Sequence, residues 1–531
     1  MARNANKRIR WTAATIASRI KDRRVIQGAR TWALTPVEGR PVLLSARGEE
    51  PPPLVIRCPL RGRYAVTVGH CSVRENRDQS PGTLALEFED GERFVMPSVG
   101  GFGTFHVAVR DLKGGALTLR KINTGAAGLA HLAFERSDGP GQAFGPDEAR
   151  RSPIIWGITD QGDQVIEMAS AEIRDVAVGM RYHRELGFNA VSWHMYLGSC
   201  EYPTRVGTTF PLIDLDDKDH LRILSEHRRA PYVDVLSRQF IHRYDCMAQG
   251  IRLAHEQGLT YMPCMRMNNE WHADWCLGHA TEEFLEKFWC PEFFMKHPEY
   301  WAQYKSGVRT GGGMDYSHAA VRRYRLGILR EVMENYPAID GMFLDLHRHP
   351  PMVSYPDAAV KAFRKRCGID VRRVKPINEN VMDPRWLKFR ARYFTTFMRA
   401  LKKEKERLGK RYPTVVRTAT SFDRCLFECA DLATWFDERL VDVLMMEGTR
   451  VEDYGASLKP VIGEASKAGV KVMGCFADPG FVMNSPWRKV AGIAEKWLEE
   501  GAAGVAFYES NAVVCGESVR RNMPQWVRSL G

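Results

Sequence analysis

The 531-residue sequence has no apolar run long enough to cross a bilayer, which argues against a membrane protein. Its basic start is followed by neither an apolar stretch nor a small-residue cleavage site, so a secretory signal is not evident. The 12 cysteines include no Cys-x-x-Cys pair, which argues against a structural zinc site. We therefore expect a reduced, cytoplasmic protein that needs no membrane, metal or cofactor.

The net charge of +12 is not spread evenly along the chain. Residues 1–30 contain nine Lys and Arg residues and one Asp, a net +8, so the remainder is only mildly basic. A nucleic-acid arm and a targeting peptide are alternatives, but the simplest interpretation is a basic amphipathic helix. We predict that residues 1–29 form a surface helix or a disordered arm with no part in turnover, and that the protein binds no nucleic acid.

From about residue 30 to 150 the sequence is rich in Gly, Pro and short β-branched runs such as "YAVTVGH" and "TFHVAVRD". Short alternating strands separated by turns are typical of an antiparallel sandwich. We therefore predict an N-terminal β-sandwich as an accessory domain over residues 30–150.

A different pattern fills residues 151–531, where short apolar runs alternate with amphipathic segments of 12 to 25 residues. This alternation is the signature of repeated βα units. Eight units predict an α/β fold, a (β/α)8 TIM barrel, rather than a doubly wound sheet. The predicted strands begin near residues 154, 189, 259, 339, 414, 441, 470 and 503.

Polar residues stand at the carboxyl ends of these predicted strands. In a (β/α)8 barrel the ends meet at one face, where catalytic groups lie. The apolar run 339–344 leads directly into ionisable residues at 345–349. The sequence thus predicts a polar site at the barrel mouth, with candidates Asp160, Trp193, His194, Arg266, Asn268, Glu270, Asp345, His347, Arg348, Glu447, Asp478 and Glu509.

Period-two alternation predicts which side chains point into the barrel. Asp345 and Glu447 share the inward parity of the fourth and sixth strands, and in the eighth strand Phe507 and Glu509 are predicted to do so. A single strand-end acid is often an N-cap or the partner of an Arg. Several acids at one mouth would repel one another, a cost tolerated chiefly where chemistry needs carboxyl groups with separated pKa values.

Long insertions follow the second and third predicted strands. Residues 271–313 are rich in aromatic side chains, among them Trp271, which suit the apolar faces of sugar rings. The same side chains could instead form the core of a small subdomain. The Gly run at 309–318 lacks the GxxxxGK[ST] pattern, so we interpret it as a flexible loop and not as a phosphate cradle.

The fourth strand and the helix before it resemble a known family. The stretch "MDYSHAAVRRYRLGILREVMENYPAIDGMFLDLHRHP" carries a DYS-x-x-x-VR helix and a DG-x-x-x-D-x-x-R-x-P strand end. It is similar to bacterial glycosyl-hydrolase-like barrel proteins of the family 10 glycosylhydrolase type. The resemblance covers most of 154–511 and implies a TIM barrel, hydrolysis of glycosidic bonds, and matching roles for Asp345 and Arg348. The stretch "LHRHP" after Asp345 departs from the family, where an aromatic residue often follows the Asp.

Cleavage of a glycosidic bond needs one carboxylic acid to protonate the leaving oxygen and a second carboxylate as nucleophile or as activator of water. We assign Asp345 as nucleophile and Glu447 as acid/base, an arrangement that looks like retaining α-glycosidase barrels; Glu270 is the reserve acid. The remaining candidates would bind the hydroxyls of a carbohydrate substrate or hold the carboxylates ionised.

Two other functions are compatible with these residues. A metal-dependent hydrolase or isomerase would use His194, Asp345, His347 and an acid from another strand, although the first strand has no His-x-His and a cation interrupts His347-Arg348-His349. A carbohydrate-binding protein whose barrel has lost its chemistry is the other alternative.

Overall fold

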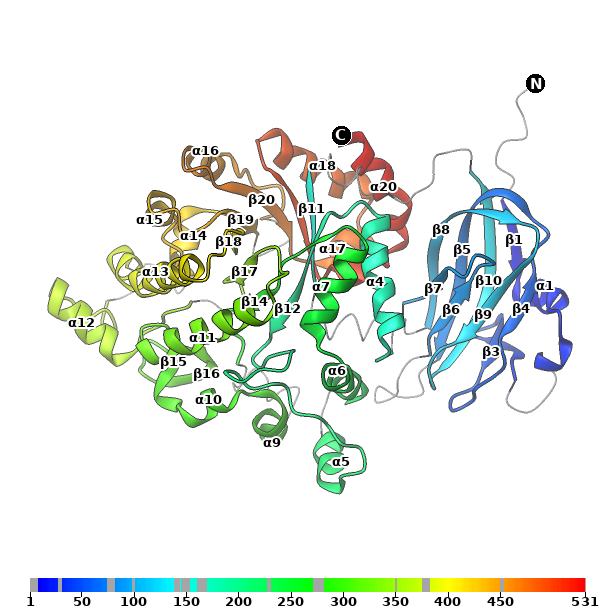
Figure 1. Cartoon of the computed structure of the whole chain (residues 1–531), viewed down its shortest axis with the longest axis horizontal. Coiled ribbons are helices and arrows are strands. Elements are labelled where there is room, and N and C mark those ends of the chain that lie inside the picture. The colour runs from blue at the N-terminus through cyan, green and yellow to red at the C-terminus, as the bar shows by residue number, and fades with distance from the viewer. Residues whose placement is uncertain are drawn as a thin grey trace.

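The computed structural model describes residues 8–26, 31–73, 82–97, 101–137, 144, 153–159, 170–226, 231–270, 281–348, 351–374, 383–448 and 453–530. A β-rich region and a (β/α)8 barrel follow one another along the chain and lie side by side (Figure 1). Within these residues, no helix combines the length and the apolar content that crossing a membrane requires.

Antiparallel strands make up the β-rich region. One sheet has the order β2-β3-β10-β5-β8, with β1 also paired to β10, and the other has the order β4-β9-β6-β7. This confirms a β-rich region ahead of the barrel, and face-to-face packing as a sandwich stays a prediction. The strands are β1 (Ile9–Thr12), β2 (Ala33–Val37), β3 (Arg40–Ser45), β4 (Leu54–Arg57), β5 (Arg61–Val73), β6 (Leu84–Glu87), β7 (Arg93–Val95), β8 (Gly101–Lys113), β9 (Ala116–Lys121) and β10 (Ala126–Arg136).

The basic N-terminal segment differs from the prediction of a surface helix or a disordered arm. Residues Ile9–Thr12 form β1, which pairs antiparallel with β10, and α1 (Ala13–Arg19) follows directly. Trp11 is buried against Phe134, with the ring centroids 4.6 Å apart, and Ile16 is fully buried. The expected helix is thus found over Ala13–Arg19, whereas Ile9–Thr12 is a strand, because a few apolar side chains among the charges complete the sheet. That the segment takes no part in turnover stays a prediction.

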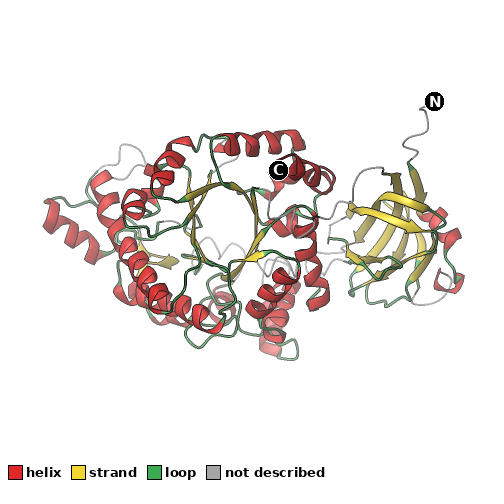
Figure 2. Ribbon diagram, turned by 45° about the horizontal axis from the view of Figure 1, so that its top comes forward, coloured by secondary structure: helices red, strands yellow, loops and turns green. Residues whose placement is uncertain are grey.

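Eight parallel strands close into a barrel in chain order, because the first strand pairs with both the second and the eighth. Figure 2 shows the strands as a ring enclosed by helices. The predicted architecture is therefore confirmed. The strands are β11 (Ile154–Thr159), β12 (Ala190–Tyr196), β13 (Thr260–Tyr261) with β14 (Cys264–Arg266), β17 (Met342–Asp345), β18 (Thr414–Ala419), β19 (Val443–Glu447), β20 (Lys471–Phe476) and β21 (Gly504–Tyr508).

Helices cover the outside of the barrel, and the long insertions add shorter elements around its mouth. The described helices are α4 (Ile173–Glu185), α5 (Lys218–Ser225), α6 (Pro231–Arg243), α7 (Cys246–Glu256), α9 (Glu282–Phe284), α10 (Glu292–Lys296), α11 (Ala319–Asn335), α12 (Asp357–Cys367), α13 (Pro384–Arg407), α14 (Phe422–Phe427), α15 (Leu432–Asp437), α16 (Lys459–Lys467), α17 (Pro479–Asn484), α18 (Trp487–Glu499), α19 (Ser510–Val513) and α20 (Glu517–Leu530). The hairpin β15 (Trp301–Gln303) and β16 (Arg309–Met314) contains the Gly run that was expected to be a flexible loop.

The barrel interior is a separate apolar cluster that shows which side chains point inward. Asp345 follows the inward Phe343, and Glu447 follows the inward Met445, as alternation predicted. The eighth strand has the opposite parity from the prediction. The interior cluster consists of Trp156, Ile158, Ala190, Met262, Cys264, Phe343, Val415, Val443, Met445, Met473, Cys475, Ala506 and Tyr508, whereas Val505 and Phe507 belong to the outer core.

The β-rich region and the barrel share buried polar contacts. The hydroxyl of Tyr182 on α4 donates to the carbonyl of Val95 over 2.7 Å, and Nη2 of Arg520 on α20 donates to the carbonyl of Val107 over 2.7 Å. The same Nη2 lies 3.1 Å from Oε2 of Glu185. These contacts bind two barrel helices to the edge of the N-terminal sheets.

Candidate active site

One arginine binds both Asp345 and Glu447, which lie at the carboxyl ends of β17 and β19, two strands separated by β18. Arg417 lies on β18, between β17 and β19, and its Nη1 donates to Oδ2 of Asp345 over 2.7 Å. Its Nε donates to Oε2 of Glu447 over 2.6 Å, and its Nη2 contacts the same oxygen. All three side chains are buried, so the ion pairs form away from water, where electrostatic interactions are stronger.

The environment of Asp345 keeps its carboxyl group ionised. Complete burial by itself would raise the pKa, but the charge of Arg417, followed by His194 and Arg266, outweighs burial and holds the pKa well below its ordinary value. The backbone N–H of His347 also donates to Oδ1 over 3.0 Å. A carboxylate that stays charged at the end of a barrel strand suits a nucleophile or an electrostatic stabiliser.

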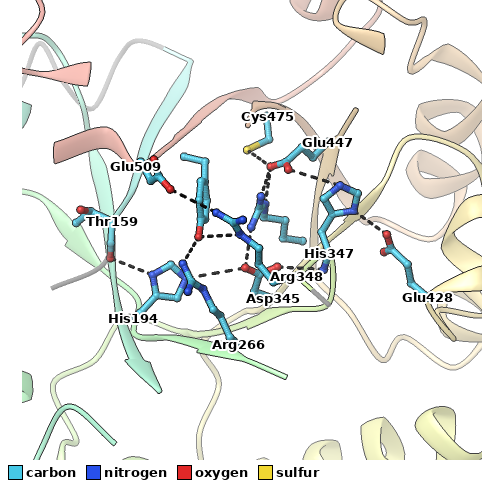
Figure 3. A network of polar contacts seen from close by, with 12 residues as sticks. Thr159, His194, Arg266, Asp345, His347, Arg348, Glu428, Glu447, Cys475 and Glu509 are labelled. Atoms are coloured by element: carbon cyan, nitrogen blue, oxygen red, sulfur yellow. Dashed lines mark hydrogen bonds and ion pairs between the residues drawn. The ribbon is translucent and has the colours of Figure 1, made fainter. Parts of the chain in front are cut away.

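His347 lies between two carboxylates (Figure 3). Its Nδ1 is 2.6 Å from Oε1 of Glu428, and its Nε2 is 3.5 Å from Oε1 of Glu447. The other oxygen of Glu428 accepts from the hydroxyl of Thr418 over 2.6 Å. Burial alone would lower the pKa of His347, but the bond to Glu428 and the charges of both glutamates raise it above its ordinary value.

Tyr508 is the last residue of the eighth strand, and arginine side chains contact its hydroxyl and its ring. Its hydroxyl accepts from Nη2 of Arg266 and from Nε of Arg348, the latter over 3.1 Å. Arg348 reaches Glu509 over 3.4 Å, and the side chains of both are 35% exposed. Arg348 and Glu509 are therefore the solvent-accessible ion pair of the site, beside the buried carboxylates (Figure 3).

His194 approaches Asp345 from β12. Its Nδ1 lies 3.1 Å from the carbonyl oxygen of Thr159, which can only accept, so Nδ1 carries a proton and Nε2 faces the carboxylate. The distance from Nε2 to Oδ2 of Asp345 is 3.9 Å. His194 thus approaches the same carboxylate oxygen that accepts from Arg417.

One group among the described residues has the donor types of a metal site. Donor atoms of His194, Cys264 and Asp345 all lie within 4.8 Å of one another. The group does not fit a divalent ion well, because Oδ2 of Asp345 already accepts from the guanidinium of Arg417 and burial raises the pKa of the Cys264 thiol. His347, the third ligand of the predicted metal set, is bound to Glu428 instead.

Glu270, the reserve acid, lies in a different buried cluster. It forms an ion pair with Arg325 on α11 and accepts from the hydroxyl of Tyr196 over 3.1 Å. Both charged side chains are fully buried. Its contacts are those of a structural ion pair, and none of them is to Asp345, His347 or Glu447.

Three other predicted substrate-binding residues contact groups outside the carboxylate pair. Trp193 is buried against Tyr261 in the outer core, with ring centroids 6.3 Å apart, because it has the opposite parity to His194. Asp478 caps α17 by accepting from the N–H of Gly480 over 2.7 Å. In the amide orientation that satisfies its hydrogen bonds, Asn268 donates to the carbonyls of Met267 and Met314, each over 3.1 Å. Asp160 and Trp271 lie outside the described residues.

The aromatic residues of the third insertion contact mainly one another and the neighbouring elements. Trp301 stacks on Phe294 at a centroid distance of 4.6 Å, and Trp289 packs on Phe210 at 5.2 Å. Tyr304, in contrast, is 58% exposed. For the described aromatic residues, these contacts are those of a subdomain core.

Arg417, Tyr508 and Glu428 belong to the site and were missed from the sequence. Arg417 carried a usable signal, because a charged residue at an inward position of a buried strand needs a partner of opposite charge. Tyr508 was missed because of the parity error in the eighth strand. Glu428 lies 81 residues from His347, and nothing in its neighbourhood marks it.

The fold and the site define a (β/α)8 barrel with two carboxylates joined through an arginine at its carboxyl-end face. No protein-family model and no curated protein matches the chain. Solved structures to which the chain is similar include the PgaB (BpsB) glycoside hydrolase domain from Bordetella bronchiseptica, with 11% identity over 70% of this chain and 98% of that chain, at a TM-score of 0.45. The CBM22-1-GH10 modules of the Clostridium thermocellum endo-1,4-beta-D-xylanase 10B have 12% identity over 91% and 93%, at 0.34. The GH26-CBM35 beta-(1,4)-mannanase of Podospora anserina has 10% identity over 98% and 95%, at 0.30. The assignment of the fold rests on the strand pairings themselves.

Proposed function

We propose that this protein is a glycoside hydrolase in which Asp345 is the nucleophile and Glu447 the acid/base. The observation that carries the proposal is that both carboxylates lie at inward-facing positions at the ends of their strands and bind the same arginine, Arg417. Glycosidic bonds are cleaved by such pairs, which flank the scissile bond at the carboxyl-end face of a barrel.

The two carboxylates have different surroundings, which supports different roles. Asp345 is held ionised by Arg417, as a nucleophile must be. Glu447 faces His347, a group able to carry a proton, through its second oxygen. The partly exposed Arg348 and Glu509 offer charged hydrogen-bonding groups to sugar hydroxyls at the entrance.

The substrate in this proposal is a carbohydrate that reaches the carboxylates past Arg348 and Glu509. Because both carboxylates are buried, side chains at the mouth must move when a sugar binds. Arg348 is well placed to do so, since its contact with Glu509 is 3.4 Å long and partly exposed.

A screen of chromogenic α- and β-glycosides tests the proposal, with wild type and Asp345→Asn assayed side by side. Wild type should release the chromophore from at least one glycoside, and the variant should lose that activity. Turnover that depends on added metal, with metal retained by the purified protein, would favour the metal-dependent alternative. Sugar binding without turnover in wild type would favour the non-catalytic alternative.

A further inference from the structure

The oxygens of Glu447 have separate partners, which determines where this residue can carry a proton. Oε2 is occupied by two nitrogens of Arg417 and lies 3.4 Å from the thiol sulfur of Cys475. A proton on Glu447 must therefore sit on Oε1. That oxygen faces Nε2 of His347 at 3.5 Å, a distance typical of groups that tighten only when substrate is bound.

Glu428 fixes the other side of the His347 ring. Its Oε1 lies 2.6 Å from Nδ1, while Oε2 accepts from the Thr418 hydroxyl over 2.6 Å and from the Ala419 N–H over 3.1 Å. Every oxygen of Glu428 thus has a donor, which holds the carboxylate and the ring in one orientation. As in catalytic triads, a carboxylate here orients an imidazole toward a reacting group.

We propose that His347, oriented by Glu428, stores the proton that Glu447 delivers to the leaving glycosidic oxygen. This inference rests on the proposed function and extends it to two further residues that act through Glu447. His347 and Glu428 are positioning residues, because neither needs to touch the sugar.

The proton balance of the two steps closes without any other reactant. When Asp345 attacks the anomeric carbon, the bond to the leaving oxygen breaks, and that oxygen takes the proton from Nε2 of His347, passed on through Oε1 of the ionised Glu447. His347 becomes neutral and keeps the proton on Nδ1, which stays hydrogen-bonded to Glu428. Water then displaces Asp345, and its proton passes through Oε1 of Glu447 back to Nε2 of His347.

The charged groups that face His347 support this role. Glu428 from the end of α14 and Glu447 from β19 favour the imidazolium, while Arg417 from β18 opposes it. Burial also opposes the charged form, yet the two carboxylates outweigh both effects and raise the pKa of the ring. Removing the charge of Glu428 should therefore weaken the hold on the proton while leaving Glu447 in place.

Glu428→Gln tests the inference, with Glu331→Gln as the matched control. Glu331 is another buried glutamate that accepts hydrogen bonds, from Tyr202 over 3.2 Å and from the N–H of Arg205 over 2.7 Å, outside this site. Glu428→Gln removes the carboxylate that favours the charged ring, so the pKa of His347 should fall. We therefore expect the alkaline limb of the kcat/KM profile to move about one pH unit lower, which corresponds to a loss of about 1.4 kcal/mol of interaction with the charged ring. Glu331→Gln should leave the limb where it is in wild type. An unmoved limb in an active Glu428→Gln enzyme would overturn the inference.

An NMR titration of the His347 ring gives a second measurement that needs no activity. In wild type the ring should titrate above 6.5, the ordinary value for histidine, and in Glu428→Gln it should titrate lower than in wild type. A wild-type ring that titrates at or below 6.5 would refute the stored proton even if the variant fails to fold. If wild type cleaves no glycoside, the proposed function fails, while the titration still decides whether His347 holds the proton.

Discussion

The guanidinium carbon of Arg417 lies 4.0 Å from the centroid of the Tyr508 ring, so this cation stacks over the last residue of the eighth strand while it binds acids from the fourth and sixth. One side chain thereby joins four strands of the barrel at its mouth. Lys would not replace it, because an ammonium group cannot donate to two carboxylates in a fixed plane and stack on a ring at once.

Replacing Arg417 with Met should destabilise the protein strongly, because two carboxylates would remain buried without their cation. We expect the free energy of unfolding to fall by about 3–5 kcal/mol, measured by urea denaturation near neutral pH. Arg399→Met is the control, since Arg399 and Glu438 form an exposed pair whose loss should cost less than about 1 kcal/mol. Equal losses in the two variants would contradict this ranking.

Asp345→Asn keeps the shape of the side chain and removes its charge. If Asp345 is the nucleophile, turnover should fall at least about a hundredfold, with little change in sugar affinity. Steady-state kinetics and isothermal titration would measure the two quantities, and circular dichroism would check the fold. Retention of full turnover would exclude Asp345 from the chemistry.

Glu447→Gln and Glu270→Gln separate a chemical role from a structural one. Glu447→Gln should abolish most turnover, because the amide cannot give or take the proton at the leaving oxygen. Glu270→Gln should mainly lower the melting temperature, since it breaks the buried pair with Arg325. Loss of activity in folded Glu270→Gln alongside an active Glu447→Gln would transfer the acid/base role to Glu270.

The lowered pKa of Asp345 predicts a pH window for stability. A carboxyl group with a depressed pKa in the folded state stabilises the protein fully above its unfolded value, here 3.8, and that contribution is lost as the pH falls through the folded value. Wild type should therefore lose its advantage over Asp345→Asn as the pH drops below 3.8. Urea denaturation at a series of pH values measures the difference, and an advantage that grows toward acid would contradict the sign.

Trp11→Ala should destabilise the N-terminal sheets, since Trp11 is buried between β1 and Phe134. Truncation of a buried aromatic side chain typically costs about 3–5 kcal/mol, so the melting temperature should fall clearly. Turnover below that temperature should stay within a few-fold of wild type, because β1 belongs to the β-rich region, which lies to one side of the barrel (Figure 1). A melting temperature unchanged by the substitution would show that β1 adds nothing to stability.

The sequence predicted the barrel well because its signal is repeated eight times. Apolar runs and amphipathic segments alternate in chain order, and the run at residue 154 coincides with β11 (Ile154–Thr159). The third strand, predicted as one run, is divided at Met262 and Pro263, since Pro has no N–H to continue the ladder. In the basic segment, the charge masked Trp11 and Ile16, which are the residues that pack.

The site was predicted only where its residues end strands. Asp345 and Glu447 could be found by that rule, whereas Glu428 depends on a contact across 81 residues. The parity of the eighth strand failed because Glu509 follows the strand with a φ of 49°, in the left-handed region, so it does not continue the alternation. Tyr508, one residue earlier, takes the inward position instead.

The contacts of Tyr182 and Arg520 with the N-terminal sheets have a consequence for how the molecule melts. Side chains of two barrel helices donate hydrogen bonds to carbonyl groups of β7 and β8, so unfolding the sheets would leave a buried guanidinium without the carbonyl groups it binds. The two regions should therefore unfold in one calorimetric transition, with equal calorimetric and van't Hoff enthalpies. A barrel expressed without the sheets would expose Tyr182 and Arg520 and would be prone to aggregate.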